Sequence, residues 1–411
     1  MRARACLVLG LLGVVHGCGG APETPLGRGG AGGIINGAGG GTTGIITNSL
    51  TTTTTSSDVG GSGGGAPACP PTPPVEGPPI SAPSGKWTWV PVSGSRCRDG
   101  SPAGVGIRLN PSSTKVAIYL EGGGACFNTA TCAIALASFG KATFDAWAAT
   151  VGQLGIFDDG AVDNPIKDWN VVYVPYCSGD VHAGSASGAD VPSGPQDQDF
   201  LGYENMGHYL GRLVPTFADA THVLLTGVSA GGFGAAFNYH RVAAAFCPIP
   251  VTLIDDSGPP LADDYLAPCL QKKWRELWNL AAALPAECAD CTLPSGGGLV
   301  NYADHLAATW PNSRLGLISS TRDSVISTFF GYGADGCTKT TPIPGDVYAE
   351  GLGDLRDNHL SSASGWGSYY VDSTTHTYLI GPGFYLAQVN GVKLTQWMRD
   401  LLNGYPSHVG P

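Results

Sequence analysis

Short runs of consecutive apolar residues recur along the chain from about residue 86 onward. Runs of this length, rich in Val, Ile, Leu and Tyr, are typical of strands that are covered on both faces of a sheet. The strands predicted in this way are 115–120, 170–174, 222–225, 251–254, 315–318 and 369–371.

Stretches with a helical pattern lie between these runs. The helices predicted in this way are 130–137, 205–218, 232–246, 265–283 and 393–402. Strands that alternate with helices indicate a mostly parallel sheet with helices on both faces. We therefore predict one α/β domain over residues 85–411.

Residues 19–84 have a different character. They are rich in Gly, Thr, Ser and Pro and contain almost no apolar residues that could fill a core. Such a segment is typical of a disordered tether, flexible in its Gly/Ser/Thr-rich part and stiffer where it is Pro-rich. Cys69 lies within it, and a disulfide from Cys69 to the domain would end the free tether early.

The first residues predict export. Arg2 and Arg4 precede an apolar run that is too short to span a bilayer, and residues 1–18 end in a small residue followed by Cys18. This is the pattern of a signal peptide. Its end resembles a bacterial lipoprotein box, so we predict that Cys18 is lipidated and that this anchor is the only membrane contact. The alternative is an ordinary secreted protein, because His16 stands where such boxes carry a small residue.

Charge and cysteine content narrow the class of protein. A net charge of −11 leaves no basic face for phosphates, which argues against nucleic-acid binding. Twelve cysteines less Cys6 and Cys18 leave ten, and in an exported protein an even number favours disulfides. Cys126 and Cys132 are spaced to close a small loop. The CxxC of Cys288 and Cys291 lacks a second pair at zinc-like spacing, so we predict a structural disulfide network and no metal.

Candidate chemistry begins at GVSAGG, residues 227–232. The motif is common by chance in a chain with 62 glycines, but here a predicted strand precedes it and a predicted helix follows it at once. A strand-to-helix turn of this kind places a serine in a strained conformation at a helix N-terminus, where negative charge is favoured. We predict that Ser229 is a nucleophile and that the amide of Ala230 is an oxyanion donor.

A glycine run, EGGGACFN, follows the strand 115–120. Bare backbone amides at such a position can approach a substrate carbonyl, as in the HGGG-type loops of esterases. A phosphate loop would need Lys-Ser/Thr after the glycines, and this chain has Ala125-Cys126 there. The remaining alternatives are an oxyanion loop formed by the run Gly122, Gly123 and Gly124, and an ordinary tight turn.

The acid of a catalytic triad should follow Ser229 at a strand end. Asp255 and Asp256 follow the strand 251–254, and Asp323 follows the strand 315–318. The strand two places after the nucleophile is the commoner source of the acid. We therefore favour Asp323 and expect Asp255 and Asp256 to be structural, hydrogen-bonding loop amides near the site.

The base should be a histidine later in the chain. His376 lies between the last predicted strand and the last predicted helix, from where it can reach back over the sheet. His359 is the other candidate on chain order, and we expect it to be structural. The loop 177–203 is expected to line one side of the site; its Ser, Gly and Asp content would suit a carbohydrate, and a solvated loop is the alternative.

Several motifs taken in order resemble the pectin acetylesterase family, which also includes Notum-like carboxylesterases. They are LEGGGACFN, GVSAGG, LIDDSG, ISSTRDSVIS and THTYL, between about Cys97 and the C-terminus. The neighbourhoods of Asp323 and His376 are similar to those of bacterial members. The resemblance implies an α/β-hydrolase fold, Ser229, Asp323 and His376 as nucleophile, acid and base, and Gly123, Gly124 and Ala230 as oxyanion donors. Plant and animal relatives often carry a tryptophan after the glycines, where this chain has Ala125.

The implied function is ester hydrolysis through an acyl-serine, without a metal or organic cofactor. The favoured substrate is an acetylated polysaccharide such as pectin. One alternative keeps the triad and changes the substrate to a lipid or polyester. The other is a non-catalytic surface binding module with the same fold.

Overall fold

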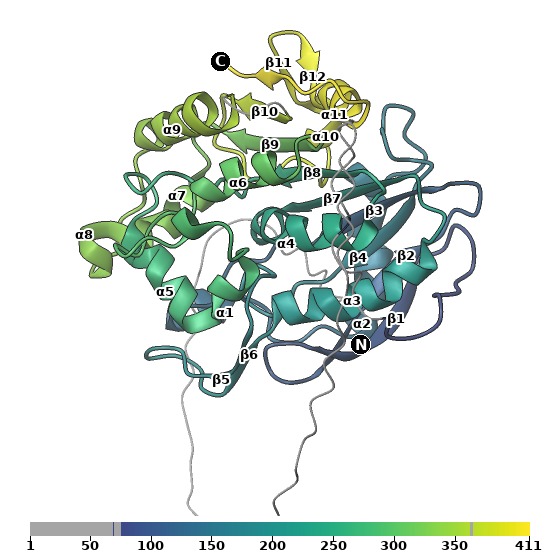
Figure 1. The fold of residues 1–411 in the computed structure, drawn as a ribbon, viewed down its shortest axis with the longest axis horizontal. Coiled ribbons are helices and arrows are strands. Elements are labelled where there is room, and N and C mark those ends of the chain that lie inside the picture. The colour runs from purple at the N-terminus through teal and green to yellow at the C-terminus, as the bar shows by residue number, and fades with distance from the viewer. Residues whose placement is uncertain (1–68, 70–74, 362–364) are drawn as a thin grey trace, which may run out of the picture. The chain divides into compact units, whose positions relative to one another are not determined.

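The computed structural model describes Cys69, residues 75–361 and residues 365–411 (Figure 1). The predicted signal peptide 1–18, its lipidated Cys18 and most of the predicted tether 19–84 lie outside the described residues and stay predictions. Within the described residues, no helix combines the length and the apolar character needed to cross a membrane.

The domain is built on one sheet of nine strands in the order β1-β2-β4-β3-β7-β8-β9-β10-β13. The pairs β1–β2 and β2–β4 are antiparallel, and the remaining pairs are parallel. Two small antiparallel pairs, β5–β6 and β11–β12, lie outside it. The strands are β1 Thr88–Arg96, β2 Pro102–Arg108, β3 Lys115–Leu120, β4 Asn170–Val174, β5 Ala186–Ala189, β6 Gln198–Phe200, β7 His222–Val228, β8 Val251–Asp256, β9 Arg314–Ser320, β10 Trp366–Val371, β11 Gln388–Val389, β12 Val392–Lys393 and β13 His408–Val409.

Helices connect the strands and cover the sheet. The α-helices are α1 Thr129–Ile134, α2 Lys141–Ala148, α3 Gly202–Thr216, α4 Ala230–Phe246, α5 Pro268–Trp278, α6 Asn301–Thr309, α7 Ser324–Phe330, α8 Ala334–Cys337, α9 Gly345–Asp354, α10 Gly383–Leu386 and α11 Leu394–Leu402. Short 3₁₀ turns are at Val151–Gln153, Gly155–Phe157, Leu280–Ala283, Ala289–Cys291 and Gly331–Gly333, and a π-helical turn is at Leu355–Leu360.

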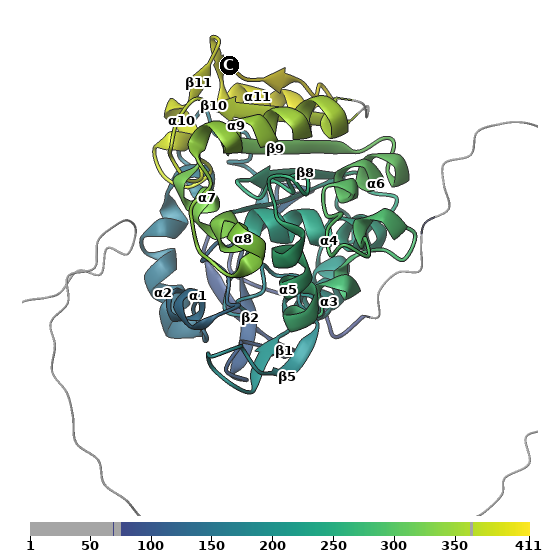
Figure 2. The ribbon, with the colours of Figure 1, turned by 90° about the vertical axis from the view of Figure 1, so that its left-hand side faces the viewer.

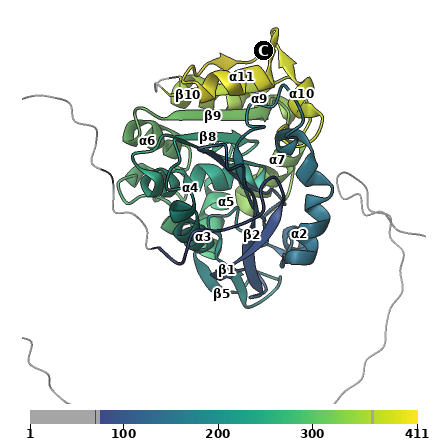
Figure 3. The same cartoon turned by 90° about the vertical axis from the view of Figure 1, so that its right-hand side faces the viewer.

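Helices lie on both sides of the sheet (Figures 2 and 3). The two faces of the sheet bury separate apolar cores. Along β3, Val116, Ile118 and Leu120 face the core that is shared with α3, α4, α5 and α6, while Ala117 and Tyr119 face the core that is shared with α2, α10 and α11. This alternation is the period-2 rule for strands, and it explains why β3 reads as a continuous apolar run. The predicted mostly parallel sheet with helices on both faces is confirmed.

The strands β1 and β2 were not predicted from the sequence. β2 contains Gly104 and Gly106, residues that weaken a strand pattern. The structure explains them, because a Cβ at Gly104 would lie 2.4 Å from Val90 O in β1 and one at Gly106 would lie 2.2 Å from the ring of Phe144. Gly104 allows the close approach of β1, and Gly106 makes room for an aromatic ring against the sheet.

Five disulfides join the ten remaining cysteines. They are Cys69–Cys247, Cys97–Cys177, Cys126–Cys132, Cys269–Cys337 and Cys288–Cys291. The disulfide network, the local loop at Cys126 and the bonded CxxC are therefore confirmed, and Cys69 is attached to the domain at the end of α4. Residues 75–84 also lie against the domain, since Glu76 N–H donates to Gly211 O and the side chain of Ile80 is buried.

The turn from β7 into α4 lies unusually close to the end of β3. A Cβ at Gly231 would lie 2.0 Å from Leu120 O, and one at Gly227 would lie 2.3 Å from Gly231 O. Both contacts are with backbone atoms, which cannot rotate away. Glycine is therefore required at these two positions for the turn to pack against β3.

We predict that Gly231→Ala lowers the free energy of unfolding by at least about 1–3 kcal/mol, because the added methyl overpacks against backbone. The matched control is Gly353→Ala in α9, where an added Cβ meets nothing within 4 Å. Alanine is favoured over glycine in a helix, so the control should unfold at the same or a higher denaturant concentration. Equal urea midpoints for the Gly231 variant and the parent would contradict the close packing.

Candidate active site

Ser229 lies between β7 and α4 with a backbone conformation that serine rarely adopts. Its φ is 58° and its ψ is −122°, and it is the residue that precedes the first turn of α4. A non-glycine residue in such a region costs about 1–3 kcal/mol, which the surrounding structure must offset. One restraint is the hydrogen bond from Ser229 N–H to Asp256 O, 2.7 Å long. The turn presents the side chain at the N-terminus of α4, as the motif predicts.

The glycine loop after β3 crosses this turn directly. A Cβ at Gly122 would lie 2.5 Å from Val228 O and 3.0 Å from Ser229 Cβ. Gly124 has a φ of 80° and lines the same pocket as Ser229 and Ala230. Within the described part of the chain, no hydrogen bond uses the amides of Gly123, Gly124 or Ala230. These free amides are available to a substrate oxygen.

A ring of hydrogen bonds fixes the glycine loop to the loop that follows β4. The Glu121 carboxylate accepts a hydrogen bond from Tyr176 N–H at 2.9 Å, and Tyr176 Oη accepts one from Val181 N–H at 2.8 Å. His182 Nε2 then donates to Glu121 O at 2.8 Å. This ring could not be predicted from the sequence, because its members come from two loops.

Burial changes the ionisation of two members of the ring. Although Glu121 keeps some exposed surface as a residue, its carboxyl group lies below that surface, and burial raises its pKa to about 7. Burial lowers the pKa of His182 to about 4, so this imidazole is neutral at neutral pH and can donate to the carbonyl from Nε2. The ring therefore holds its shape without a charged histidine.

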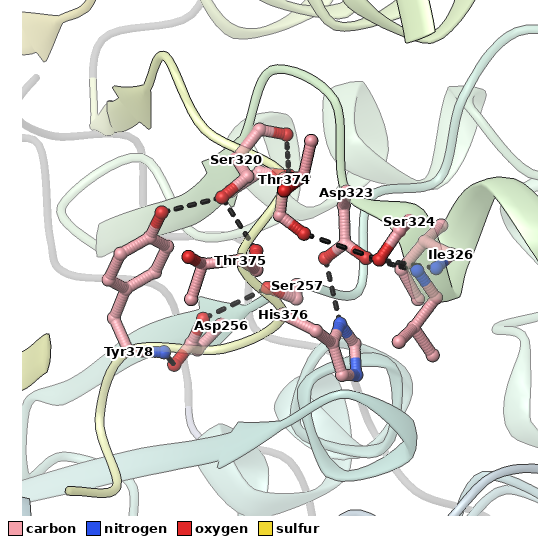
Figure 4. Close-up of polar contacts among 12 residues, drawn as sticks. Asp256, Ser257, Ser320, Asp323, Ser324, Ile326, Thr374, Thr375, His376 and Tyr378 are labelled. Atoms are coloured by element: carbon pink, nitrogen blue, oxygen red, sulfur yellow. Dashed lines mark hydrogen bonds and ion pairs between the residues drawn. The ribbon is translucent and has the colours of Figure 1, made fainter. Parts of the chain in front are cut away.

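Asp323 and His376 are in direct contact. His376 Nδ1 donates to Asp323 Oδ2 at 2.7 Å, and the other carboxylate oxygen, Oδ1, accepts from Val325 N–H and Ile326 N–H at 2.9 and 3.0 Å (Figure 4). Asp323 is completely buried, while the side chain of His376 is 17% exposed. Because Asp323 caps α7, one oxygen is occupied by the helix and the second is aimed at the imidazole.

The loop that carries His376 is fastened at several points. Ser320 Oγ donates to Thr375 O at 2.6 Å and lies 2.5 Å from Tyr378 Oη (Figure 4). The Asp256 carboxylate accepts from Tyr378 N–H and Leu379 N–H at 2.6 and 2.8 Å. The predicted structural role of Asp256 is confirmed, because it binds amides of the His376 loop through its side chain.

No hydrogen bond joins Ser229 Oγ to His376 in the described residues. In sites without substrate such bonds are often long and tighten when substrate binds. Ser229 and the Asp323–His376 pair are instead connected indirectly, through residues that contact both. Asp256 bonds both Ser229 N–H and the His376 loop, and Ile326, whose amide Asp323 caps, lines the pocket at Ser229. His359 is elsewhere, hydrogen-bonded to Asp304 at 2.6 Å.

The pocket at Ser229 is almost entirely apolar. It encloses about 440 Å³ of empty space, part of it open to solvent. Three helices supply its aromatic lining, which consists of Phe233 and Phe237 from α4, Trp274 and Trp278 from α5, and Phe329 and Phe330 from α7. Val181 places the loop 177–203 at one wall, as predicted. The aromatic lining was missed from the sequence, where these residues are indistinguishable from core positions.

Asp255 differs from its neighbour. It is 2% exposed, and its Oδ1 has no hydrogen-bond partner in the described residues. Burial and the adjacent Asp256 carboxylate raise the pKa of Asp255 well above its usual range. Cβ atoms built at Gly232 and Gly258 would lie 2.3 and 2.6 Å from this oxygen, so glycine backbone closes over it.

Three comparisons with known proteins bear on the site. The family model for pectinacetylesterase matches residues 88–293, a range that contains Ser229 and the glycine loop and ends before Asp323 and His376. Notum2 of Xenopus laevis, named a palmitoleoyl-protein carboxylesterase, is 36% identical over 155 residues, which are 36% of this chain and 30% of that protein. The chain thus spans about a third of the length of this relative.

A second relative and a solved structure are also similar to this chain. Notum1b of Danio rerio, named an inactive palmitoleoyl-protein carboxylesterase, is 37% identical over 98 residues, covering 23% of this chain and 69% of that protein. The structure of the Wnt deacylase Notum from Drosophila superposes with a TM-score of 0.58 at 21% identity, covering 79% of this chain and 95% of that one. This likeness confirms the predicted α/β-hydrolase fold.

We predict that Asp255→Asn makes stability less dependent on pH. A buried carboxyl with a raised pKa holds its proton in the folded state and releases it on unfolding. The free energy of unfolding therefore falls as pH rises above the ordinary Asp pKa of about 4. Between pH 4 and pH 8, urea denaturation should show the variant gaining at least about 1 kcal/mol on the parent. Exposed Asp219→Asn is the control, and parallel profiles for both variants would refute the assignment.

Proposed function

Because the chain belongs to the pectinacetylesterase family, we propose that it is a carboxylesterase that acts through Ser229, His376 and Asp323. The observation that carries the proposal is the 2.7 Å hydrogen bond between His376 and the capping carboxylate Asp323, beside the pocket that Ser229 lines. Chain order Ser, Asp, His and the strand-to-helix turn at Ser229 support it. Membership alone does not decide activity, since one relative is named inactive.

The proposed reaction is acyl transfer to serine. His376 Nε2 takes the proton of Ser229 Oγ as that oxygen attacks the ester carbonyl, and Asp323 keeps the imidazole oriented and stabilises its charged form. The amides of Gly123, Gly124 and Ala230 hold the oxyanion, where a single donor is worth about 3–4 kcal/mol of barrier. His376 then protonates the departing alcohol, and water hydrolyses the acyl-serine. The steps require side chains and backbone of this chain only.

The pocket favours an acyl group longer than acetyl. Six aromatic side chains line it, and an acetyl group would leave most of that apolar surface uncovered. The animal relatives are named palmitoleoyl-protein carboxylesterases, and palmitoleoyl is a long acyl group. We therefore place a lipid-type ester ahead of an acetylated polysaccharide as the substrate, the reverse of the order that the sequence favours.

The proposed location is outside the cytoplasm. Five disulfides fit an oxidising compartment. Export through residues 1–18 and a lipid anchor at Cys18 are part of the proposal and rest on the sequence pattern alone.

We predict that Ser229→Ala lowers kcat for p-nitrophenyl butyrate by roughly 10³-fold or more, because no other group can form the acyl-enzyme. Exposed Ser112→Ala, in the turn before β3, is the matched control and should keep the parental rate. If the Ser229 variant kept the rate of the control, the chain would be a non-catalytic member of the family or would use another nucleophile.

We also predict that kcat/KM rises along a series of p-nitrophenyl acetate, butyrate and octanoate. Each added methylene that the pocket buries contributes up to about fourfold, from about 0.8 kcal/mol per methylene. Phe329→Ala should flatten the rise, while Leu386→Ala, an exposed residue outside the pocket, should leave it unchanged. A sharp fall beyond acetate, together with acetate release from acetylated pectin or xylan, would instead favour the polysaccharide substrate.

A further inference from the structure

We propose that a second pocket, at the amino-terminal edge of the sheet, binds a compact oxyanion such as a phosphate or sulfate group. We call it the basic pocket. Its lining includes Lys115, Trp169, His222, Arg314, Arg399 and Asn403, around about 570 Å³ of empty space that is open to solvent. No carboxylate lines it. This is unexpected in a chain with a net charge of −11.

The strand register builds the pocket. Lys115 and His222 are the paired first residues of β3 and β7, and Arg314 is the first residue of β9. Arg399 lies in the last turn of α11. The amino ends of parallel strands share one edge of the sheet, so these side chains meet although they are far apart in sequence. Ser229 follows the opposite end of β7, which puts the two sites about 20 Å apart along the strand.

The cations of the basic pocket are held in place and are not neutralised. Among the described residues, none of Lys115, Arg314 and Arg399 forms an ion pair. Arg314 donates to the carbonyl oxygen of Leu402. Arg399 donates to Gln396 Oε1 at 2.9 Å and to the carbonyl oxygen of Asp163 at 3.2 Å.

Donors remain for a ligand. A guanidinium has five N–H donors, and these hydrogen bonds use only some of them. Asp163, whose carbonyl oxygen accepts from Arg399, has its carboxylate paired with Lys393 at 3.5 Å. Arginine presents parallel donors that match the oxygens of phosphate or sulfate, and Lys115 adds a point charge.

Helix capping explains part of this arrangement and not the rest. The C-terminus of α11 carries partial negative charge, which favours Arg314 and Arg399 nearby. Lys115 belongs to β3 and lies over the ring of Trp169, with Nζ 5.4 Å from its centroid. This ring contact is with a residue outside α11, so capping of that helix does not account for the charge of Lys115.

His222 lies near two positive charges of the basic pocket, those of Arg314 and Lys115. His222 is buried and hydrogen-bonded to Thr252 Oγ1 at 2.8 Å. Burial first, and then the positive charges of Arg314 and Lys115, lower the pKa of His222 to about 4. The lining of the basic pocket contains no carboxylate beside these two charges. An oxyanion in the basic pocket would supply the missing negative charge.

The test is a thermal-shift titration of the full chain with inorganic phosphate and with sulfate at constant ionic strength. Both should raise Tm saturably, with an apparent Kd in roughly the millimolar range, because a ligand that binds only the folded state stabilises it. Sodium chloride at the same ionic strength should give no saturable rise. Galacturonate, a monocarboxylate, should bind several-fold more weakly.

Variants locate the site. Arg399→Gln and Lys115→Gln should each weaken phosphate binding by at least about tenfold, the usual effect of removing one charged hydrogen-bond donor. Lys393→Gln is the matched control, since it removes one positive charge that does not line the pocket. Unchanged affinity in both pocket variants, equal weakening in the control, or an equal rise with chloride would each overturn the proposal.

Discussion

The left-handed backbone at Ser229 is the constraint on which the rest of this structure depends. A serine at φ 58° is held there because the turn after β7 cannot move away from the end of β3. Gly227 and Gly231 give the turn its space, and Gly122 lets the neighbouring loop cross it within contact distance. Close backbone packing therefore holds Ser229 in its strained conformation. The same packing places the glycine loop, with its free amides, beside the turn that carries the Ser229 side chain.

Asp256 extends that constraint from the turn to the remainder of the site. Its carbonyl oxygen accepts the Ser229 amide, and its carboxylate accepts two amides of the His376 loop. Burial raises the pKa of Asp256 to about 6 even though the amides of Leu379 and Tyr378 oppose the rise. One residue at the end of β8 thus sets the relative position of two segments that are distant in sequence. Asp255, one residue earlier, faces the other side of the strand, and its Oδ1 has no hydrogen-bond partner among the described residues.

The sequence predicts those parts of the fold in which one segment carries its own signal. The apolar runs of β3, β4, β7, β8 and β9 are continuous because both faces are buried, and GVSAGG lies between a strand and a helix. β2 was not predicted, because its glycines are required by contacts with other segments, the backbone of β1 at Gly104 and the ring of Phe144 at Gly106. The aromatic lining of the pocket could not be predicted from the sequence for a related reason. Phe233 and Trp274 have ordinary helical spacing, and only the packing of three helices shows that they border a cavity.

The two ends of β7 lie near helix termini of opposite partial charge. Negative charge is therefore favoured at one edge of the sheet and positive charge at the other. At the carboxyl end, Ser229 precedes α4, where the positive end of the helix dipole favours negative charge. At the amino end, His222 lies near the C-terminus of α11, whose carbonyl oxygens attract cations such as Arg314. Capping of α11 requires only donors near Leu402. The presence of Lys115 in the same lining, with no acid among the lining residues, is what distinguishes a basic pocket from a capped helix.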